Sequence, residues 1–224
     1  MHSMAAVRAA KRVGISWLDQ PAFEDTDTLV FTVNGWSLDL RVFTTGPDAG
    51  NIDWATAARV TETGNSTTGN PELKWDHLID SRPPSDLPDQ GVFQSLPNGD
   101  VTETGVMFNP KTGRNEHYVE TWRRYPTQPG EQYCILERID HDKGGSAYLG
   151  KVGPRTLGLA LDDDGVFEAY REQVQDGQVK RVFESTPGPS LPSLPETLPE
   201  DYVDGAEVEL GGCRWAVCTA GRVG

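Results

Sequence analysis

Trp75-Asp76-His77-Leu78-Ile79-Asp80 and Val119-Glu120-Thr121-Trp122-Arg123 place tryptophan beside ionisable residues, and each stretch has the composition of a β-strand. Side chains of a strand point alternately to its two faces, so one face is predicted to carry Trp75, His77 and Ile79. In the second stretch the shared face carries Tyr118, Glu120 and Trp122. A face with bulky aromatic residues is normally buried, and a histidine or glutamate on it either is hydrogen-bonded in the core or lines a cavity. The two stretches therefore predict a sheet that encloses a pocket.

Turn signals divide the rest of the chain into short strands. Asn34-Gly35, Asn98-Gly99, Asp164-Gly165 and Asp176-Gly177 are dipeptides typical of β-hairpin turns. About a dozen β-rich runs, without a long amphipathic helix, predict an all-β fold of antiparallel barrels or sandwiches. The runs are 28–33, 37–44, 73–80, 100–108, 117–125, 133–139, 148–152, 156–161, 166–174, 179–184, 206–210 and 214–219. Residues 5–13 fit either a short helical turn or a tail, and residues 53–60 fit either a strand or a short helix.

Two proline-rich segments and one glycine-rich turn organise the chain. Residues 81–97 are expected to form a loop that can act as a lid on a barrel mouth, and residues 186–199 an extended segment that crosses the surface. The turn at residues 141–145 is the predicted boundary between two units. Residues 1–142 are then an N-terminal barrel with the pocket, and residues 143–224 a smaller C-terminal barrel or sheet.

The composition excludes several partners. With 34 acidic and 20 basic residues the net charge is −14, so neither nucleic acid nor an anionic membrane is expected to bind. Apolar residues make up only 36% of the chain, but 24 glycines bring the total into the ordinary globular range, so a core can form. With free cysteines, no apolar run of membrane-spanning length and no secretory signal, a cytoplasmic location is expected, with the nucleus as a second one.

No motif for a metal or a cofactor is present. Cys134, Cys213 and Cys218 contain no CxxC pair, and the four histidines do not cluster at metal-ligand spacings. The run Asp162-Asp163-Asp164-Gly165 lacks the alternating ligands of a calcium loop and is typical of a hairpin tip. Because glycine-rich phosphate loops and the Gly-x-Ser-x-Gly nucleophile motif are also missing, no cofactor and no metal are expected.

A set of short motifs resembles one known family. In chain order they are Ile15-Ser16-Trp17, Pro21-Ala22-Phe23-Glu24, Asp53-Trp54-Ala55, residues 75–82, residues 99–105, Asn109-Pro110-Lys111-Thr112-Gly113, Glu120-Thr121-Trp122-Arg123 and Arg214-Trp215-Ala216-Val217. They resemble the fungal Hri family, named for its interaction with a yeast casein-kinase-I-type protein kinase. The resemblance implies two lipocalin-like β-barrels in tandem and a protein kinase as partner, but no catalytic mechanism. Residues 153–161 depart from the family's pattern, which leaves room for a divergent member with its own activity.

Three ionisable residues are candidates for acid–base chemistry. His77 can act as a general base near neutral pH. Positions 77 and 80 of a strand point to opposite faces, so His77 and Asp80 form no dyad unless a bulge intervenes. Glu103 and Glu120 are each expected on an apolar or aromatic face, where a carboxyl group either pairs with a cation or becomes a proton donor. The structural alternative for each is a satisfied core histidine or a buried glutamate–arginine pair.

Further residues are predicted around the pocket and its mouth. The expected partners of Glu103 are Arg82, Arg123 and Arg138. The ligand-binding candidates are Trp54, Trp75, Asp80, Arg82, Thr104, Tyr118, Trp122 and Arg123.

Two functions remain open on the sequence. The first is a barrel that binds a small apolar or aromatic molecule; if it is an enzyme, it is a cofactor-free isomerase, cyclase or lyase in which His77, Glu103 and Glu120 supply acid and base. The second is a non-catalytic, kinase-associated module that uses sheet edges and residues 186–199 to engage partners. A cavity of about 300 Å³ or more with converging carboxylates favours the first, and a fully packed apolar barrel the second. A homodimer is an expected assembly.

Overall fold

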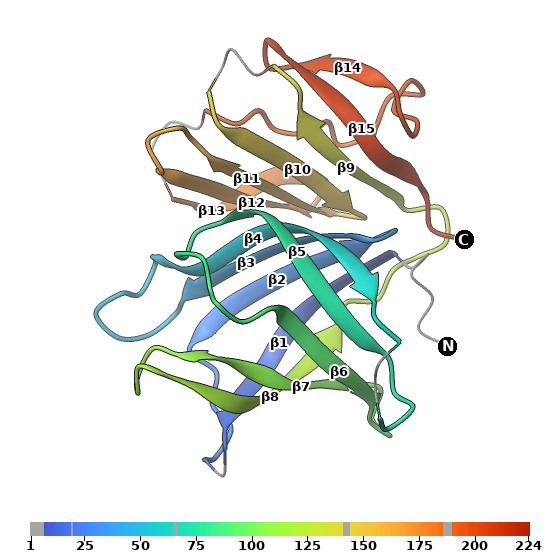
Figure 1. Ribbon diagram of the computed structural model, residues 1–224. Helices are drawn as coiled ribbons and strands as arrows, with labels where there is room; N and C mark the ends of the chain where they lie inside the picture. The colour runs from blue at the N-terminus through green and yellow to red at the C-terminus, as the bar shows by residue number, and fades with distance from the viewer. Residues whose placement is uncertain (1–6, 19, 65–66, 141–143, 186–189) are drawn as a thin grey trace.

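Two antiparallel β-sheets make up the molecule (Figure 1). The computed structural model describes residues 7–18, 20–64, 67–140, 144–185 and 190–224, and these residues contain strands and turns but no helix. The described part of the chain accordingly has no helix of the length and hydropathy that a membrane span needs. The predicted all-β antiparallel fold is confirmed.

The first eight strands close into a barrel in sequential order, with β8 pairing back onto β1. The strands are β1 (Val7–Trp17), β2 (Thr26–Val33), β3 (Trp36–Phe43), β4 (Ile52–Glu62), β5 (Glu72–Asp80), β6 (Asp89–Ser95), β7 (Val101–Asn109) and β8 (Arg114–Arg124). The predicted Asn34-Gly35 hairpin joins β2 to β3, and both of its residues have positive φ angles of 48° and 82°, as a type I′ turn requires.

The remaining strands form a seven-stranded sheet in the order β13-β12-β11-β10-β9-β15-β14. They are β9 (Gln132–Arg138), β10 (Ser146–Val152), β11 (Arg155–Leu161), β12 (Phe167–Gln175), β13 (Gln178–Glu184), β14 (Glu207–Leu210) and β15 (Cys213–Arg222). Because β9 is a central strand here, the chain crosses between the sheets at residues 125–131, earlier than the expected boundary at 141–145. Residues 141–143 of that boundary lie outside the described residues.

The two sheets share one apolar core. The outward side chains of β2–β4, including Leu29, Phe31, Leu38 and Leu40, pack in one cluster with residues of the second sheet such as Ile135 and Leu159. The approach is close: a Cβ added at Gly150 would lie 2.5 Å from Leu38 Cδ1, so any larger residue would force Leu38 to move. The barrel strands that face the second sheet are therefore buried on both sides.

The other face of the second sheet is covered by the described part of the proline-rich segment. Leu191, Leu194, Leu198 and Tyr202 are each at most 8% exposed and pack in a second cluster around the fully buried Trp215. The segment was expected to cross the surface, but its leucines are core residues. Residues 186–189 lie outside the described residues.

Two strands were not predicted, and a third had been left open between strand and helix. Residues 5–13 were expected to be helical or a tail, but residues from Val7 onward form β1, and the ambiguous residues 53–60 lie in β4. Within the proline-rich residues 81–97, expected to be a loop and lid, Asp89–Ser95 forms β6 and completes the barrel wall. The prolines stand outside this strand, where their missing N–H groups cost no ladder hydrogen bond.

Candidate functional site

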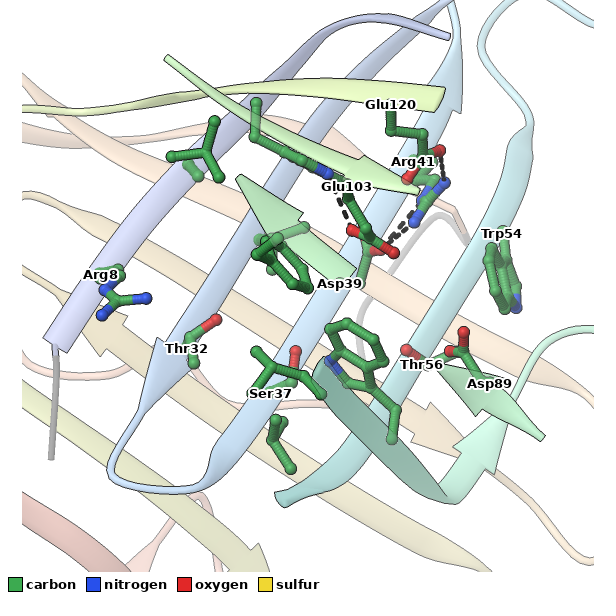
Figure 2. A pocket seen from close by; sticks show the side chains of 18 of the residues that line it. Arg8, Thr32, Ser37, Asp39, Arg41, Trp54, Thr56, Asp89, Glu103 and Glu120 are labelled. Atoms are coloured by element: carbon green, nitrogen blue, oxygen red, sulfur yellow. Dashed lines mark hydrogen bonds and ion pairs between the residues drawn. The ribbon is translucent and has the colours of Figure 1, made fainter. Parts of the chain in front are cut away.

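The polarity of the barrel interior is set by β3. In Ser37-Leu38-Asp39-Leu40-Arg41-Val42 the leucines and valine point outward into the shared core, while Ser37, Asp39 and Arg41 line a cavity inside the barrel. Charged side chains from several strands converge on this cavity (Figure 2). The lumen is thus a buried polar site enclosed by an apolar shell.

Arg41 lies at the centre of the charged groups. Its Nε and Nη2 donate to Asp39 Oδ2 at 2.9 and 2.8 Å, and its Nη1 donates to Glu120 Oε1 at 2.7 Å. The guanidinium carbon lies 4.7 Å from the ring centroid of Trp54 and 5.5 Å from that of Trp122, within cation–π range. Burial alone lowers the pKa of Arg41, but the two carboxylates outweigh it and raise the pKa above its ordinary value. Arg41 is therefore a fixed cation in the lumen.

A second arginine closes the deep end of the site. Arg12 Nη1 donates to the same Glu120 Oε1 at 2.6 Å, while its Nε and Nη2 donate to Glu24 at 2.9 and 3.0 Å. Glu120 is 1% exposed, and its carboxylate is bridged by two buried guanidinium groups. The predicted position of Glu120 between Tyr118 and Trp122 on the lumen face agrees with the structure, and its cations are Arg12 and Arg41.

Glu103 is a buried carboxyl group with neutral donors. Tyr118 donates its hydroxyl to Glu103 Oε1 at 2.7 Å, and Trp122 Nε1 donates to Oε2 at 2.9 Å. Glu103 stands directly opposite Glu120 in the β7–β8 ladder. Burial, and then the like charge of Glu120, raise the pKa of Glu103 to about 8. At neutral pH Glu103 is therefore mostly a carboxylic acid inside the barrel.

The cation expected beside Glu103 is not the one found. Arg123 pairs with Asp100, Arg82 pairs with Asp53, and Arg138 donates to backbone carbonyls, so the prediction that one of these three pairs with Glu103 is wrong. The arginine that acts on Glu103 is Arg41, which is on β3.

Two glycines make room for this acid. A Cβ at Gly91 would lie 2.7 Å from Glu103 Cγ, and one at Gly105 would lie 2.8 Å from the Tyr118 hydroxyl. A side chain at either position would therefore force Glu103 or Tyr118 to move from its place in the lumen.

Asp39 has an oxygen without a partner. Its Oδ2 is engaged by Arg41, but its Oδ1 is buried and has no hydrogen-bond partner among the described residues. Burial raises the pKa of Asp39, and Arg41 offsets only part of that effect. Buried polar atoms are nearly always hydrogen-bonded, and leaving one unpaired costs about 1–3 kcal/mol.

His77 is clamped between two aspartates. The β4–β5 register shifts so that Ala57 pairs with Ile79 but Ala58 pairs with His77, which leaves Leu78 as a bulge residue. Ile79 consequently packs in the outer core, so the prediction that it shares a face with His77 is wrong. The bulge brings Asp80 to His77, with Nδ1 and Asp80 Oδ2 2.7 Å apart and Nε2 and Asp89 Oδ2 2.9 Å apart.

This clamp changes the chemistry expected of His77. Burial lowers the pKa of His77, but the hydrogen bonds and charges of Asp80 and Asp89 outweigh it and raise the pKa to about 9. The imidazole is cationic at neutral pH and both its nitrogens are engaged. It ties β5 to the first residue of β6, and in this state it offers no free lone pair to a substrate.

The ligand-binding candidates fall into three groups. Trp54, Trp75, Tyr118 and Trp122 line the cavity. Asp80 and Arg82 lie beside it: Asp80 accepts the Trp54 indole N–H at 2.8 Å, and Arg82 stacks 4.6 Å from the Trp54 ring centroid.

Thr104 and Arg123 form the third group and do not line the cavity. Both are exposed on the outside of the barrel, where Thr104 borders a separate hollow over β6–β8 and Arg123 pairs with Asp100. Their positions offer nothing to a ligand in the lumen.

The cavity itself measures about 100 Å³. That is smaller than the roughly 300 Å³ expected of a site for a drug-sized ligand, because aromatic side chains occupy much of the lumen. Its lining is fully buried around Arg41 and Glu120 and partly exposed at Arg8, Thr32 and Trp75, so it opens toward the latter end. No group of three or more metal-ligating side chains occurs among the described residues.

Two lining residues, Asp39 and Arg41, and Arg12, which pairs with the lining residue Glu120, escaped sequence reasoning. Arg12, Asp39 and Arg41 were not candidates, because alternation in β1 and β3 is normally interpreted with the apolar residues inside and the charges in solvent. The available signal was the unbroken alternation of apolar and charged residues from Leu38 to Val42. This pattern fits a strand buried on both faces as well as a strand with one face in solvent.

Comparisons with known proteins agree with this fold. The family whose model matches is described as "Protein HRI1", and the match covers residues 8–219. None of the curated proteins matches the chain. Among solved structures, the chain is similar to the uncharacterized protein YLR301w from Saccharomyces cerevisiae, with a TM-score of 0.76 and 16% identity over 96% of this chain and 99% of that one. At that identity the likeness shows the fold alone.

Proposed function

The chain belongs to the HRI1 family, and from the geometry of the lumen we propose that its barrel binds one small molecule carrying a hydrogen-bond donor. The observation that carries the proposal is Asp39 Oδ1, a buried acceptor on the cavity wall that no described residue satisfies. An O–H or N–H group of a ligand in the cavity would remove the cost of leaving this acceptor unpaired.

The cavity limits the size and shape of the ligand. An apolar cavity of about 150 Å³ accommodates benzene, so about 100 Å³ suits a few waters or at most one small ring whose substituents extend toward the open end. Trp54, Trp75 and Trp122 contribute flat walls, and Trp75 packs 5.8 Å from Phe93. These walls favour a planar ligand, and Asp39 and Glu103 fix its polar end.

The same residues can support proton transfer. Glu103 is mostly protonated at neutral pH and can donate, while Asp39 Oδ1 is an unengaged acceptor on the same cavity. If the bound molecule is turned over, the reaction class that fits is a cofactor-free isomerisation, cyclisation or elimination. In that scheme Glu103 is the acid, Asp39 takes the role first assigned to His77, and Arg41 holds a developing oxyanion.

The kinase-associated alternative has less support. It relied on free sheet edges and on the proline-rich segment. The barrel is closed and Leu191, Leu194 and Leu198 are buried against the second sheet, so among the described strands this mode is left with the edge strands β13 and β14. A partner could reach these leucines only by displacing them from the core.

The proposal is tested with phenol as a probe and toluene as its donor-free counterpart. A ligand at ten times its Kd stabilises the folded state by about 1.4 kcal/mol, which raises the melting temperature of a chain of this size by roughly 3–6 °C. We expect phenol to produce this shift and toluene to produce much less. Equal shifts with both compounds would refute the role of Asp39.

A blocking variant tests the location. Ala10 lines the cavity, so Ala10→Leu fills space without removing a polar contact; Ala49→Leu, in the exposed β3–β4 turn, adds the same atoms elsewhere. Phenol binding should be lost in Ala10→Leu and kept in Ala49→Leu. Retained binding in Ala10→Leu would place the probe outside the lumen.

A further inference from the structure

Two arginines stand together at the open end of the cavity. Arg124 of β8 pairs with Ala10 of β1, and Arg8 lies two residues before Ala10 on the same face of β1. Both arginines line the cavity. Figure 2 shows Arg8 near Thr32 on one side of the site, with Arg41 and Glu120 on the other.

These arginines differ from the others of the lumen in having no anionic partner within residues 7–18, 20–64, 67–140, 144–185 and 190–224. Arg12 and Arg41 each pair with two carboxylates, but no ion pair or hydrogen bond joins the side chain of Arg8 or Arg124 to any residue that the structure describes. Of the acidic lining residues, Asp39, Glu103 and Glu120 are buried, and the partly exposed Asp89 is engaged by His77.

The pair is electrostatically unfavourable as it stands. Burial, and then the charge of Arg124, lower the pKa of Arg8 below its ordinary value. Like charges placed together at a partly buried cavity mouth repel each other. The chain has a net charge of −14, yet none of its described carboxylates neutralises this pair. An anion bound between the two guanidinium groups would relieve this repulsion.

The distance between the two arginines and Asp39 limits the size of the rest of the bound molecule. Arg8 pairs with Thr32, and Thr32 pairs with Ser37, so these three residues form one layer of the barrel. Asp39 is two residues beyond Ser37 on β3, about 7 Å farther in. A six-membered ring with substituents at opposite positions covers this distance along the barrel, and the long arginine side chains bridge the two-strand separation between β1 and β3 to reach its anionic end.

Building on the proposed function, we propose that Arg8 and Arg124 bind the carboxylate of the lumen ligand, which is therefore a monocyclic carboxylate with a hydrogen-bond donor on the far side of its ring. Guanidinium groups match the planar geometry of a carboxylate and can bind it through two parallel hydrogen bonds. The aromatic walls hold the ring, and Asp39 Oδ1 accepts the hydrogen bond from its donor.

Three probes separate this proposal from the one on which it rests: phenol, 4-hydroxybenzoate and its neutral counterpart 4-hydroxybenzamide. Affinities are measured by titration, following the tryptophan indole N–H signals by NMR. Hydrogen bonds to a charged group predict that 4-hydroxybenzoate binds at least about tenfold more tightly than 4-hydroxybenzamide. The Arg8→Gln/Arg124→Gln variant should abolish that difference and leave the affinity for phenol unchanged.

The control is Arg114→Gln, which removes an exposed arginine from the other end of β8 and should retain the tenfold preference. Equal affinities for the two hydroxybenzoyl probes, or a preference that survives in the double variant, would overturn the carboxylate site while phenol binding keeps the lumen proposal in place. Failure of all three probes to bind would overturn the proposed function and this inference together.

Discussion

Replacing Glu103 by glutamine should make the protein more stable at alkaline pH. The folded-state pKa of Glu103 is raised from its ordinary 4.5 to about 8, so the folded protein holds a proton that the unfolded chain releases between these pH values. Stability from this group is fully present below pH 4.5 and is lost as pH rises toward 8. At about 1.4 kcal/mol per pH unit, the whole loss is about 5 kcal/mol.

Glutamine mimics the protonated acid. Its carbonyl oxygen can accept from Trp122 Nε1 while its amide donates to the Tyr118 oxygen, so both contacts survive. The variant carries no titrating proton at this position. Its free energy of unfolding, minus that of the unaltered protein, should therefore rise with pH from 4.5 and level off above 8.

The assay is urea unfolding at half-unit intervals from pH 5 to pH 9. Taking the difference between the two proteins cancels every other titrating group, and Glu209→Gln, exposed on β14, is the matched control whose difference should stay flat. A flat difference for Glu103→Gln across the whole range would show that Glu103 is ionised in the folded state, and the acid role proposed for it would fail.

Three further perturbations follow from the geometry. The pKa of His77 is raised from 6.5 to about 9. Its stabilisation of roughly 3 kcal/mol is therefore present below pH 6.5 and lost as pH rises through 9, so His77→Asn should cost that amount at pH 6 and little at pH 10, as measured by urea unfolding. A cost that does not depend on pH would contradict the clamp. Gly91→Ala should cost about 1–3 kcal/mol because its Cβ would meet Glu103 at 2.7 Å, whereas Gly14→Ala, with its nearest contact at 3.6 Å, should cost less; equal costs would refute the steric argument. Leu194→Ala should cost about 2–5 kcal/mol in the same assay if the proline-rich segment is part of the core, and an unchanged midpoint would show that it is not.

The local signals in the sequence were sufficient for the all-β class and for most of the hairpins. Hairpin dipeptides such as Asn34-Gly35 and Asp176-Gly177 determine backbone geometry within a few residues, and both stand at positive φ where predicted. Alternation around Tyr118, Glu120 and Trp122 placed their side chains in the lumen correctly, because no bulge interrupts the pairing of β7 with β8.

The errors arose where a distant partner decides the outcome. The bulge at Leu78 reverses the alternation, so Ile79 turns outward and Asp80 comes to His77; a single sequence does not mark such an insertion. Asp39 and Arg41 face inward because the second sheet, nearly a hundred residues later, covers their leucine neighbours. β6 was hidden by the prolines on both sides of it.

The shared core has a consequence for anyone who wishes to study the barrel alone. Excised at residues 125–131, the first eight strands would present Leu29, Phe31, Leu38 and Leu40 to water as a continuous hydrophobic wall, while their charges stayed inside. Such a fragment would self-associate or fail to fold. Sequential order along the chain does not make these two sheets separable modules: each supplies the solvent-excluding surface that the other lacks.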